Sequence, residues 1–266
     1  LGIALLFLMG VGPVIAWRRA TPRNLWRAFA APVGTGLGAG LLLLVAGVPL
    51  GYAYATFALG AFALGTIVQE FWRGMRARQA MLKEGAPRAL ARVVGKNRRR
   101  YGGYVIHVGI VMIFVGVAAS SVFRIEAQQT LAAGQEMEAG RYRLRFERIE
   151  SREDGHLAAS AAVVAVFRDG VQIDTLKPEK RFYKKPKQPT TEVANRSTLR
   201  EDLYLVLGSY DPQTKLATIL AYVNPLVVWI WIGGLVLALG TMIAVWPAAI
   251  ERRAEVAVPG GVVPAE

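Results

Sequence analysis

Five long apolar runs, separated by basic or mixed segments, dominate the pattern of this chain. Each run predicts a transmembrane helix, because about 20 mainly apolar residues are needed to cross a bilayer as a helix. The runs cover residues 1–17, 29–50, 52–72, 102–123 and 223–247. We interpret the first as truncated, because the chain begins inside it. The pattern therefore predicts an α-helical polytopic membrane protein with five transmembrane helices.

Residues 124–222, between the last two apolar runs, have a sequence pattern typical of β-strands. Tyr142, Leu144 and Phe146 alternate with charged residues, as in a strand with one buried face. Turn signals occur at Glu153–Asp154–Gly155 and Asp169–Gly170. Further strands are predicted at residues 158–167, 171–176, 203–208 and 216–222. We expect five or six short strands in a small antiparallel sandwich or open barrel.

Basic residues mark one side of the membrane. Arg and Lys are concentrated in the loops at residues 17–28 and 73–101, whereas the loop between the second and third spans has none. The positive-inside rule assigns these two loops and the tail at residues 248–266 to the cytoplasm. Residues 1–123 then form a first membrane domain with four helices, and residues 124–222 lie outside, which in a bacterium is the periplasm.

Composition supports a membrane protein and excludes several other classes. The chain is 53% hydrophobic and 19% charged, more apolar than an ordinary soluble domain. Its net charge of +13 lies largely beside apolar spans, which indicates contact with the lipid bilayer and no nucleic-acid partner. The chain has no cysteine, which excludes disulfides, thiolate metal sites and cysteine nucleophiles. No catalytic motif occurs, so enzyme activity would depend on a cofactor or on partner chains.

His107 is the main candidate for chemistry, because an ionisable side chain at membrane depth is costly. On a helix it shares a face with Gly103, Val111 and Phe114, and the glycine leaves room for a flat group. A neutral imidazole in a dry site is a good axial ligand for haem iron. The alternative is a hydrogen bond to a polar group on another span. The residues alone modestly favour that alternative.

Four other features have a structural and a functional interpretation. His156 is predicted to be a solvated turn residue. Arg98–Arg100 is predicted to anchor lipid headgroups, with haem propionates as the alternative partner. Lys180–Lys185 is either a binding segment or a solvated loop. Trp229 and Trp231 are predicted to belong to an interfacial aromatic belt, with a hydrophobic macrocycle site as the alternative.

Two secondary expectations concern the basic segment and the β domain. Residues 73–100 are predicted to form an interfacial amphipathic helix that breaks near Gly85–Pro87. Glu192 and the cluster Arg200–Glu201–Asp202 are predicted to lie in a salt-bridged loop.

Four segments resemble the C-terminal part of the CcmF/NrfE family of cytochrome c-type biogenesis proteins. They are RRRYGGYVIHVGIVMIFVGVAASS, KPEKRFY, TEVANRSTLREDLYLVLG and NPLVVWIWIGGLVLALG. The resemblance implies a multi-pass protein of the bacterial inner membrane. It also implies the haem lyase (holocytochrome c synthase) component of the Ccm system, which attaches haem to apocytochrome c. Implied partners are CcmH, CcmI and the haem chaperone CcmE.

The resemblance also implies a haem b held in the membrane by two histidines. His107 matches the family motif YGG-x-x-x-H, so it is implied to be one axial ligand of the iron, with the second ligand outside this chain. Haem is in addition the implied substrate. We expect the chain alone to be inactive, because it contributes one such ligand.

Two alternative functions are retained. A membrane permease or haem exporter subunit predicts polar residues along the second and third spans, which have few. A non-catalytic membrane scaffold that recruits maturation partners predicts that His107 can be replaced without loss of cytochrome maturation.

Overall fold

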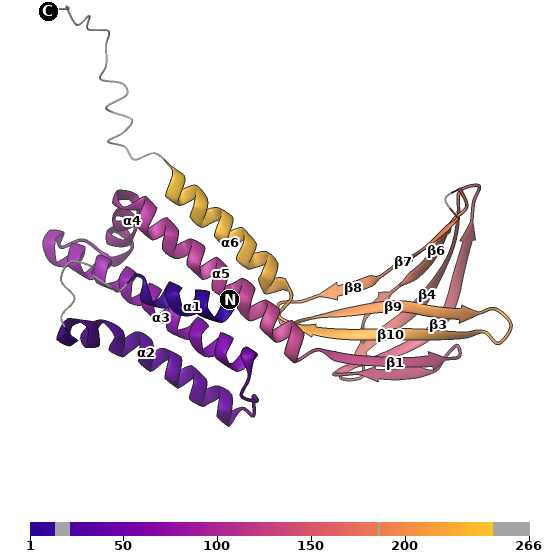
Figure 1. Cartoon of the computed structure of the whole chain (residues 1–266). Coiled ribbons are helices and arrows are strands. Elements are labelled where there is room, and N and C mark those ends of the chain that lie inside the picture. Colours follow the sequence, from indigo (N-terminus) through magenta and orange to yellow (C-terminus); the bar gives the residue numbers. More distant parts are fainter. Residues whose placement is uncertain (14–21, 186, 247–266) are drawn as a thin grey trace, which may run out of the picture. The chain divides into compact units, whose positions relative to one another are not determined.

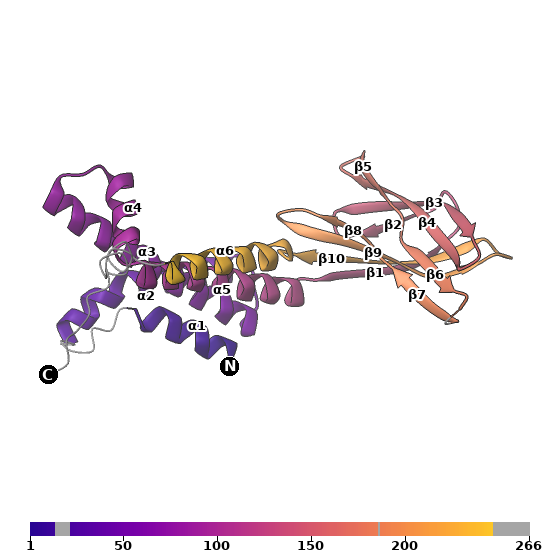
Figure 2. The same ribbon diagram turned by 90° about the horizontal axis from the view of Figure 1, so that it is seen from above.

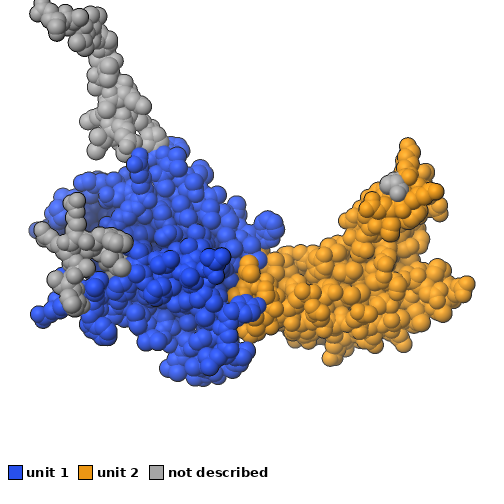
Figure 3. All heavy atoms as spheres, viewed as in Figure 1, with its two compact units in different colours: residues 1–115, 230–266 blue, residues 116–229 orange. Residues whose placement is uncertain are grey.

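The structure, a computed structural model, describes residues 1–13, 22–185 and 187–246. The chain divides into two compact units, one of residues 1–115 and 230–266 and one of residues 116–229 (Figure 3). The end of the first predicted span, the first part of the predicted loop at residues 17–28 and the predicted tail at residues 248–266 lie outside the described residues.

The first unit is helical (Figure 1). The helices of the described chain are α1 (Gly2–Val11), α2 (Pro22–Val45), α3 (Tyr52–Leu82), α4 (Ala86–Lys96), α5 (Arg98–Val122) and α6 (Val228–Val245). Four of the described helices, α2, α3, α5 and α6, are long and apolar enough to cross a membrane. The first predicted span appears as α1, an apolar helix of only 10 residues. The helical membrane architecture is therefore confirmed, and the number of five spans is not.

Helix boundaries differ from the hydropathy pattern in three places. α2 begins at Pro22, well before the apolar run at residue 29. α3 continues beyond Trp72 to Leu82, where Lys83 adopts a left-handed conformation, and α4 follows at Ala86, so the predicted break near Gly85–Pro87 is observed. α6 begins at Val228 instead of residue 223, because the preceding strand extends to Pro225.

Hydrogen bonds from α3 link it to its neighbours. The Thr66 hydroxyl donates to the Gly10 carbonyl of α1 at 3.0 Å. The Gln69 side-chain amide donates to the Ala28 carbonyl of α2 at 2.8 Å. Both bonds satisfy polar side chains within an apolar environment, and they fix α1 and α2 against the same helix.

Glycines allow α2 to approach α3 closely. A Cβ added at Gly36 would lie 3.0 Å from the Phe62 Cβ, and one at Gly40 would lie 2.7 Å from the Tyr54 hydroxyl. A side chain at Gly36 would press on the Phe62 Cβ and the Ala58 carbonyl of α3, whereas one at Gly40 would displace only the end of the Tyr54 side chain. The glycine-rich stretch of α2 is therefore a packing surface.

α5 and α6 meet through glycines that recur every seven residues. Gly102 and Gly109 of α5 face Gly233 and Gly240 of α6, and the two helices lie side by side (Figures 1 and 2). A Cβ at Gly109 would lie 2.6 Å from the Gly233 carbonyl oxygen, and one at Gly240 would lie 2.6 Å from the Ile106 amide nitrogen. The two backbones are thus in direct contact.

The second unit consists mainly of two antiparallel sheets. One has the strand order β1-β10-β9-β8 and the other β2-β3-β4-β6-β7, with β5 paired to β4. Ten strands lie in the described residues, more than the five or six predicted. Their bounds are β1 (Ile125–Leu131), β2 (Glu136–Ala139), β3 (Tyr142–Glu153), β4 (Leu157–Arg168), β5 (Val171–Leu176), β6 (Glu179–Tyr183), β7 (Gln188–Glu192), β8 (Ala194–Ser197), β9 (Glu201–Asp211) and β10 (Leu216–Pro225).

The core of this unit lies between the sheets. Tyr142, Leu144 and Phe146 are buried on one face of β3, which confirms the predicted alternation. They belong to one apolar cluster with residues of β9 and β10, such as Leu205 and Ile219. The hairpin turn at Asp169–Gly170 is also confirmed. The domain is therefore an antiparallel sandwich.

Two segments of this unit for which the sequence suggested a loop lie in strands. Most of Lys180–Lys185 lies in β6, which pairs with β4 and β7, instead of in a loop. Glu201 and Asp202 are buried at the start of β9 instead of in a loop, but the predicted ion pairing is confirmed for Glu201, which pairs with Arg141 at 3.0 Å. Glu201 accepts a hydrogen bond from the Tyr142 hydroxyl at 2.9 Å, and burial together with this bond raises the pKa of Tyr142.

Candidate functional site

His107 lies in the middle of α5 and is half-buried. Its Nδ1 atom is buried, and it has no hydrogen-bond partner among the described residues. Buried polar atoms in proteins are nearly always paired, so an unpaired imidazole nitrogen at membrane depth requires an explanation. The hydrogen bond to another span that the sequence allows is not formed by this atom.

Apolar side chains lie on either side of His107 along α5. One turn further along the helix, Val111 is buried in a cluster with Leu6 of α1 and Ala63 of α3. One turn earlier, Tyr104 is buried in a second cluster. Gly103, also one turn earlier, has open space where a Cβ would be. The surroundings of the imidazole are therefore dry on the packed side and open beside the glycine.

The other polar side chains of the helices contrast with His107. Thr56, Thr66, Thr35 and Gln69 each donate to a backbone carbonyl. Ser120 and Ser121 do the same within α5. Such pairing is the rule where water is scarce. His107 Nδ1 is the exception among the buried polar side-chain atoms described in the helical unit.

A buried carboxylate, Glu70 of α3, was missed by sequence reasoning. It is ion-paired with Arg100 of α5 and, at 3.4 Å, with Arg73. The Tyr104 hydroxyl lies 3.3 Å from Glu70 and accepts from the Arg100 Nε at 2.8 Å. The sequence signal that could have identified Glu70 is an acidic residue near the end of the third predicted span, where an ionisable side chain is costly without a partner. This network joins α3 to the segment of α5 that precedes His107.

The predicted anchor Arg98–Arg100 forms the first turn of α5. Arg100 is held by Glu70, as described above. All three arginines line a cavity at this end of the helix, together with the end of α6. The ion pair with Glu70 distinguishes Arg100 within this shared lining.

His156 is exposed in the turn between β3 and β4, as predicted. Its backbone amide and that of Leu157 each donate to the Asp154 carboxylate at 2.7 Å, which lowers the pKa of Asp154. The structure therefore assigns the segment a role in closing the turn. Within the described ranges, no group of three His, Cys, Asp or Glu side chains is arranged to hold a metal ion.

The basic segment Lys180–Lys185 is partly neutralised by ion pairs. Arg181 pairs with Glu179 at 2.8 Å and with Glu192 at 3.3 Å. Lys184 pairs with Glu153 at 2.8 Å. The predicted ion pairing of Glu192 is thereby confirmed, although the residue lies in a strand.

The two tryptophans of the last span differ in environment. The Trp229 indole donates to the Leu199 carbonyl at 2.8 Å. Trp231 is 74% exposed, as expected of a side chain that faces lipid. Neither observation requires the alternative, a hydrophobic macrocycle bound beside the two tryptophans.

Comparison with known proteins gives a consistent set of relatives. Residues 122–225 match a family model described as the CcmF C-terminal beta-sandwich. The chain is 32% identical over 259 residues to the cytochrome c-type biogenesis protein CcmF of Pseudomonas fluorescens, covering 96% of this chain and 36% of that protein. It is 34% identical over 157 residues to the probable cytochrome c-type biogenesis protein NrfE of Escherichia coli strain K12, covering 59% of this chain and 28% of that protein.

A solved structure is also similar. The chain matches the Cytochrome c Heme Lyase CcmF with a TM-score of 0.71 and 28% sequence identity. The match covers 92% of this chain and 39% of that one. The chain thus spans well under half the length of the relatives that it matches.

Proposed function

Because this chain belongs to the CcmF family of cytochrome c-type biogenesis proteins, we propose that it forms part of a haem lyase that attaches haem to apocytochrome c. Within that role, His107 is one axial ligand of a haem b in the membrane. The second ligand and the remaining lyase machinery are supplied from outside this chain. On its own the chain is inactive as a lyase.

The observation that carries this proposal is the unpaired Nδ1 of His107. An imidazole whose buried nitrogen bonds neither backbone nor side chain has no hydrogen-bonding role in helix packing, which supports a role in binding a group from outside the chain. The open space beside Gly103 leaves room for the edge of a flat ring, and the cluster around Val111 excludes water from the packed side. The residues present therefore fit a haem. When bound, haem supplies a one-electron redox centre.

The chain contributes positioning instead of covalent chemistry. It has no cysteine, so the thiols that form thioethers with haem come from the apocytochrome. Holding two reactants in the correct geometry can lower a reaction barrier by up to about 7–11 kcal/mol. The β domain is suited to this role, since its two sheets are packed on one apolar core.

The charge pattern supports an orientation in the bacterial inner membrane. The basic loops at residues 17–28 and 73–101 and the tail at 248–266 face the cytoplasm under the positive-inside rule. The β domain at residues 124–222 then lies in the periplasm, where CcmH, CcmI, holo-CcmE and apocytochrome c are its proposed partners.

The chain contains only two histidines, which provides a matched control. The protein that carries this chain is purified in detergent as wild type, His107→Ala and His156→Ala, and reduced-minus-oxidised absorption spectra are recorded. We expect the wild type and His156→Ala to show a low-spin b-type haem and His107→Ala to lose it. An unchanged low-spin spectrum in His107→Ala would show that His107 is a packing residue.

The same variants test the cellular role. Holocytochrome c formation is measured by haem staining in a strain that depends on this protein. His107→Ala is expected to reduce maturation and His156→Ala to leave it unchanged. Full maturation with His107→Ala would favour a scaffold role instead of a haem-dependent one.

A further inference from the structure

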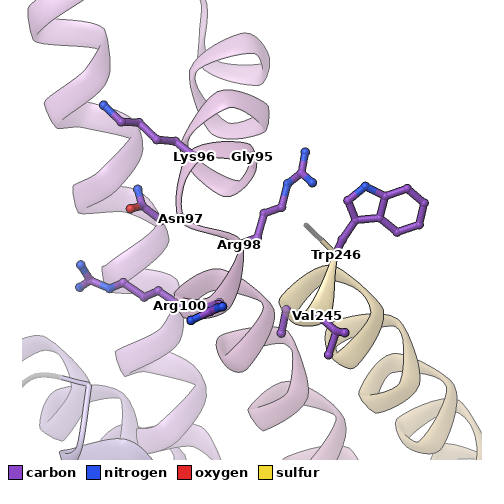
Figure 4. A pocket seen from close by; sticks show the side chains of 9 residues that line it. Gly95, Lys96, Asn97, Arg98, Arg100, Val245 and Trp246 are labelled. Carbon is purple, nitrogen blue, oxygen red and sulfur yellow. The ribbon is translucent and has the colours of Figure 1, made fainter. Parts of the chain in front are cut away.

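A basic cavity lies where the end of α4 and the start of α5 meet the end of α6 (Figure 4). Its volume is about 360 Å³, within the range of about 300–1,000 Å³ that is common for small-molecule sites. Four cations line it, Lys96, Arg98, Arg99 and Arg100, and no Asp or Glu does. Figure 4 shows Arg98 and Trp246 extending in the same direction from the adjoining ends of α5 and α6.

The positive charge of this cavity is only partly compensated. Glu70 pairs with Arg100, but within the described part of the chain neither Lys96 nor Arg99 forms an ion pair. Glu84, the acid that precedes α4, is already engaged by two other arginines, Arg78 and Arg92. The cavity therefore favours a negatively charged occupant.

An apolar groove continues from the basic cavity. This second cavity, also about 360 Å³, shares Gly95, Arg98 and Trp246 with the first. Its remaining lining is apolar and includes Leu239, Met242 and Ile243 of α6. A soluble anion would use the basic half alone. An occupant of both halves needs an anionic head and an apolar chain.

The location matches such an amphiphile. Both cavities lie at the ends of α5 and α6, two helices that are long and apolar enough to cross a membrane. Trp246 marks the level of the headgroups, where tryptophan is enriched. Basic pockets between membrane helices are suited to anionic lipid headgroups.

We propose that this composite groove binds one anionic phospholipid. The headgroup phosphate lies among the cations at the start of α5, and an acyl chain lies along Leu239, Met242 and Ile243. The bound lipid bridges α4, α5 and α6. The site is separate from His107 and does not depend on haem.

The test is a lipid titration followed by native mass spectrometry. The purified protein is delipidated in detergent and titrated with phosphatidylglycerol, with phosphatidylcholine of the same acyl chains, and with inorganic phosphate. We expect one phosphatidylglycerol to be retained under conditions that remove phosphatidylcholine. Inorganic phosphate is expected to compete weakly, because it cannot occupy the apolar groove. Equal retention of the two lipids, or equally tight binding of phosphate, would overturn the proposal.

Charge variants separate this site from a general attraction to the membrane. The double variant Arg98→Gln/Arg99→Gln is expected to weaken phosphatidylglycerol binding about 30-fold, at roughly fivefold for each cation. The control Arg23→Gln/Arg27→Gln removes the same charge from the exposed start of α2 and is expected to change binding less than about twofold. Equal effects of the two double variants would refute a localised site.

An apolar variant tests the other half of the groove. Met242→Ser replaces an exposed side chain, so it removes no core packing. It is expected to weaken phosphatidylglycerol binding and leave weak phosphate binding unchanged. The haem spectrum should remain that of the wild type in all these variants, so that failure of this proposal is distinguished from failure of the haem assignment. If Met242→Ser binds the lipid as tightly as the wild type, the proposal that the acyl chain lies in this groove is wrong.

Discussion

The glycine contact between α5 and α6 can be tested with two adjacent residues of α6. A Cβ at Gly233 would lie 2.7 Å from the Gly109 carbonyl oxygen and 2.9 Å from the Ile113 Cγ1. A Cβ at Gly234 would meet nothing within 4 Å. Gly233→Ala and Gly234→Ala therefore add the same methyl group to the same helix, and only the first adds it to the contact.

The loss of stability in Gly233→Ala depends on whether the atoms that the new methyl group meets can move aside. The Gly109 oxygen belongs to the backbone of α5, so the helices must separate by several tenths of an ångström to accept the methyl group. Overpacking of this kind costs about 1–3 kcal/mol. Replacing glycine by alanine in a helix returns about 0.5–1 kcal/mol, and this gain is common to both variants. The difference between the two variants therefore isolates the packing cost, about 1–3 kcal/mol.

The assay is unfolding of the purified protein in mixed micelles, titrated with sodium dodecyl sulfate and followed by circular dichroism. Gly233→Ala is expected to unfold at a lower detergent fraction than the wild type. Gly234→Ala is expected to unfold at the same fraction or a slightly higher one. If both variants shift the midpoint equally, the close contact between α5 and α6 is wrong.

Three further predictions concern polar groups. Thr66→Val should cost about 0.5–1.5 kcal/mol by losing the bond to α1, whereas Thr56→Val, which loses a bond within α3, should cost less in the same unfolding assay. Glu70→Gln should destabilise the helices by about 1–2 kcal/mol, since Arg100 loses its carboxylate but keeps access to solvent. Burial raises the pKa of Tyr142, so its stabilising effect is present below the ordinary tyrosine pKa of about 10 and is lost as the pH rises through the raised value. Thermal melting from pH 8 to 11 should show this loss in the wild type and not in Tyr142→Phe.

Hydropathy predicted the existence of the helices better than their ends. The apolar runs locate α2, α3, α5 and α6, because crossing a bilayer requires a long apolar helix. The run of α3 stops at Trp72, but the helix continues to Leu82 through Arg73 and Arg76, whose side chains reach water. The sequence placed a separate amphipathic helix at residues 73–100, so the error was the boundary at Trp72, across which the helix continues without a break.

The strands that were missed are mostly short or exposed. β3 and β4 carry long buried stretches and were predicted. β1, however, has only Leu131 buried, and β7, Gln188–Glu192, contains a proline and has no buried residue. These strands are held by backbone pairing at or near a sheet edge, which leaves no periodic pattern in their side chains.

The sequence predicted the part of the candidate site that a single residue reveals. It missed the part that depends on a contact between two residues distant in the sequence. His107 was singled out because it is an ionisable residue inside an apolar run. Glu70 was overlooked because its partner Arg100 lies 30 residues away and meets it only when α3 packs against α5. The contact of Gly102 and Gly109 with Gly233 and Gly240 was likewise not predicted, because it depends on a matching seven-residue spacing in two helices far apart in the sequence.

The contacts of α5 explain why His107 has a defined direction. At about 100° per residue, His107 lies about 140° around the helix from Gly102, so it points away from the glycine contact with α6. It shares a face with Arg100, which is seven residues earlier, and Arg100 is tied to Glu70 of α3. Contact with α6 on one side and an ion pair with α3 on the other oppose rotation of α5 about its axis. The direction of the imidazole is therefore set by residues that do not touch it, and a change at Glu70 should alter the haem spectrum even though His107 remains in place.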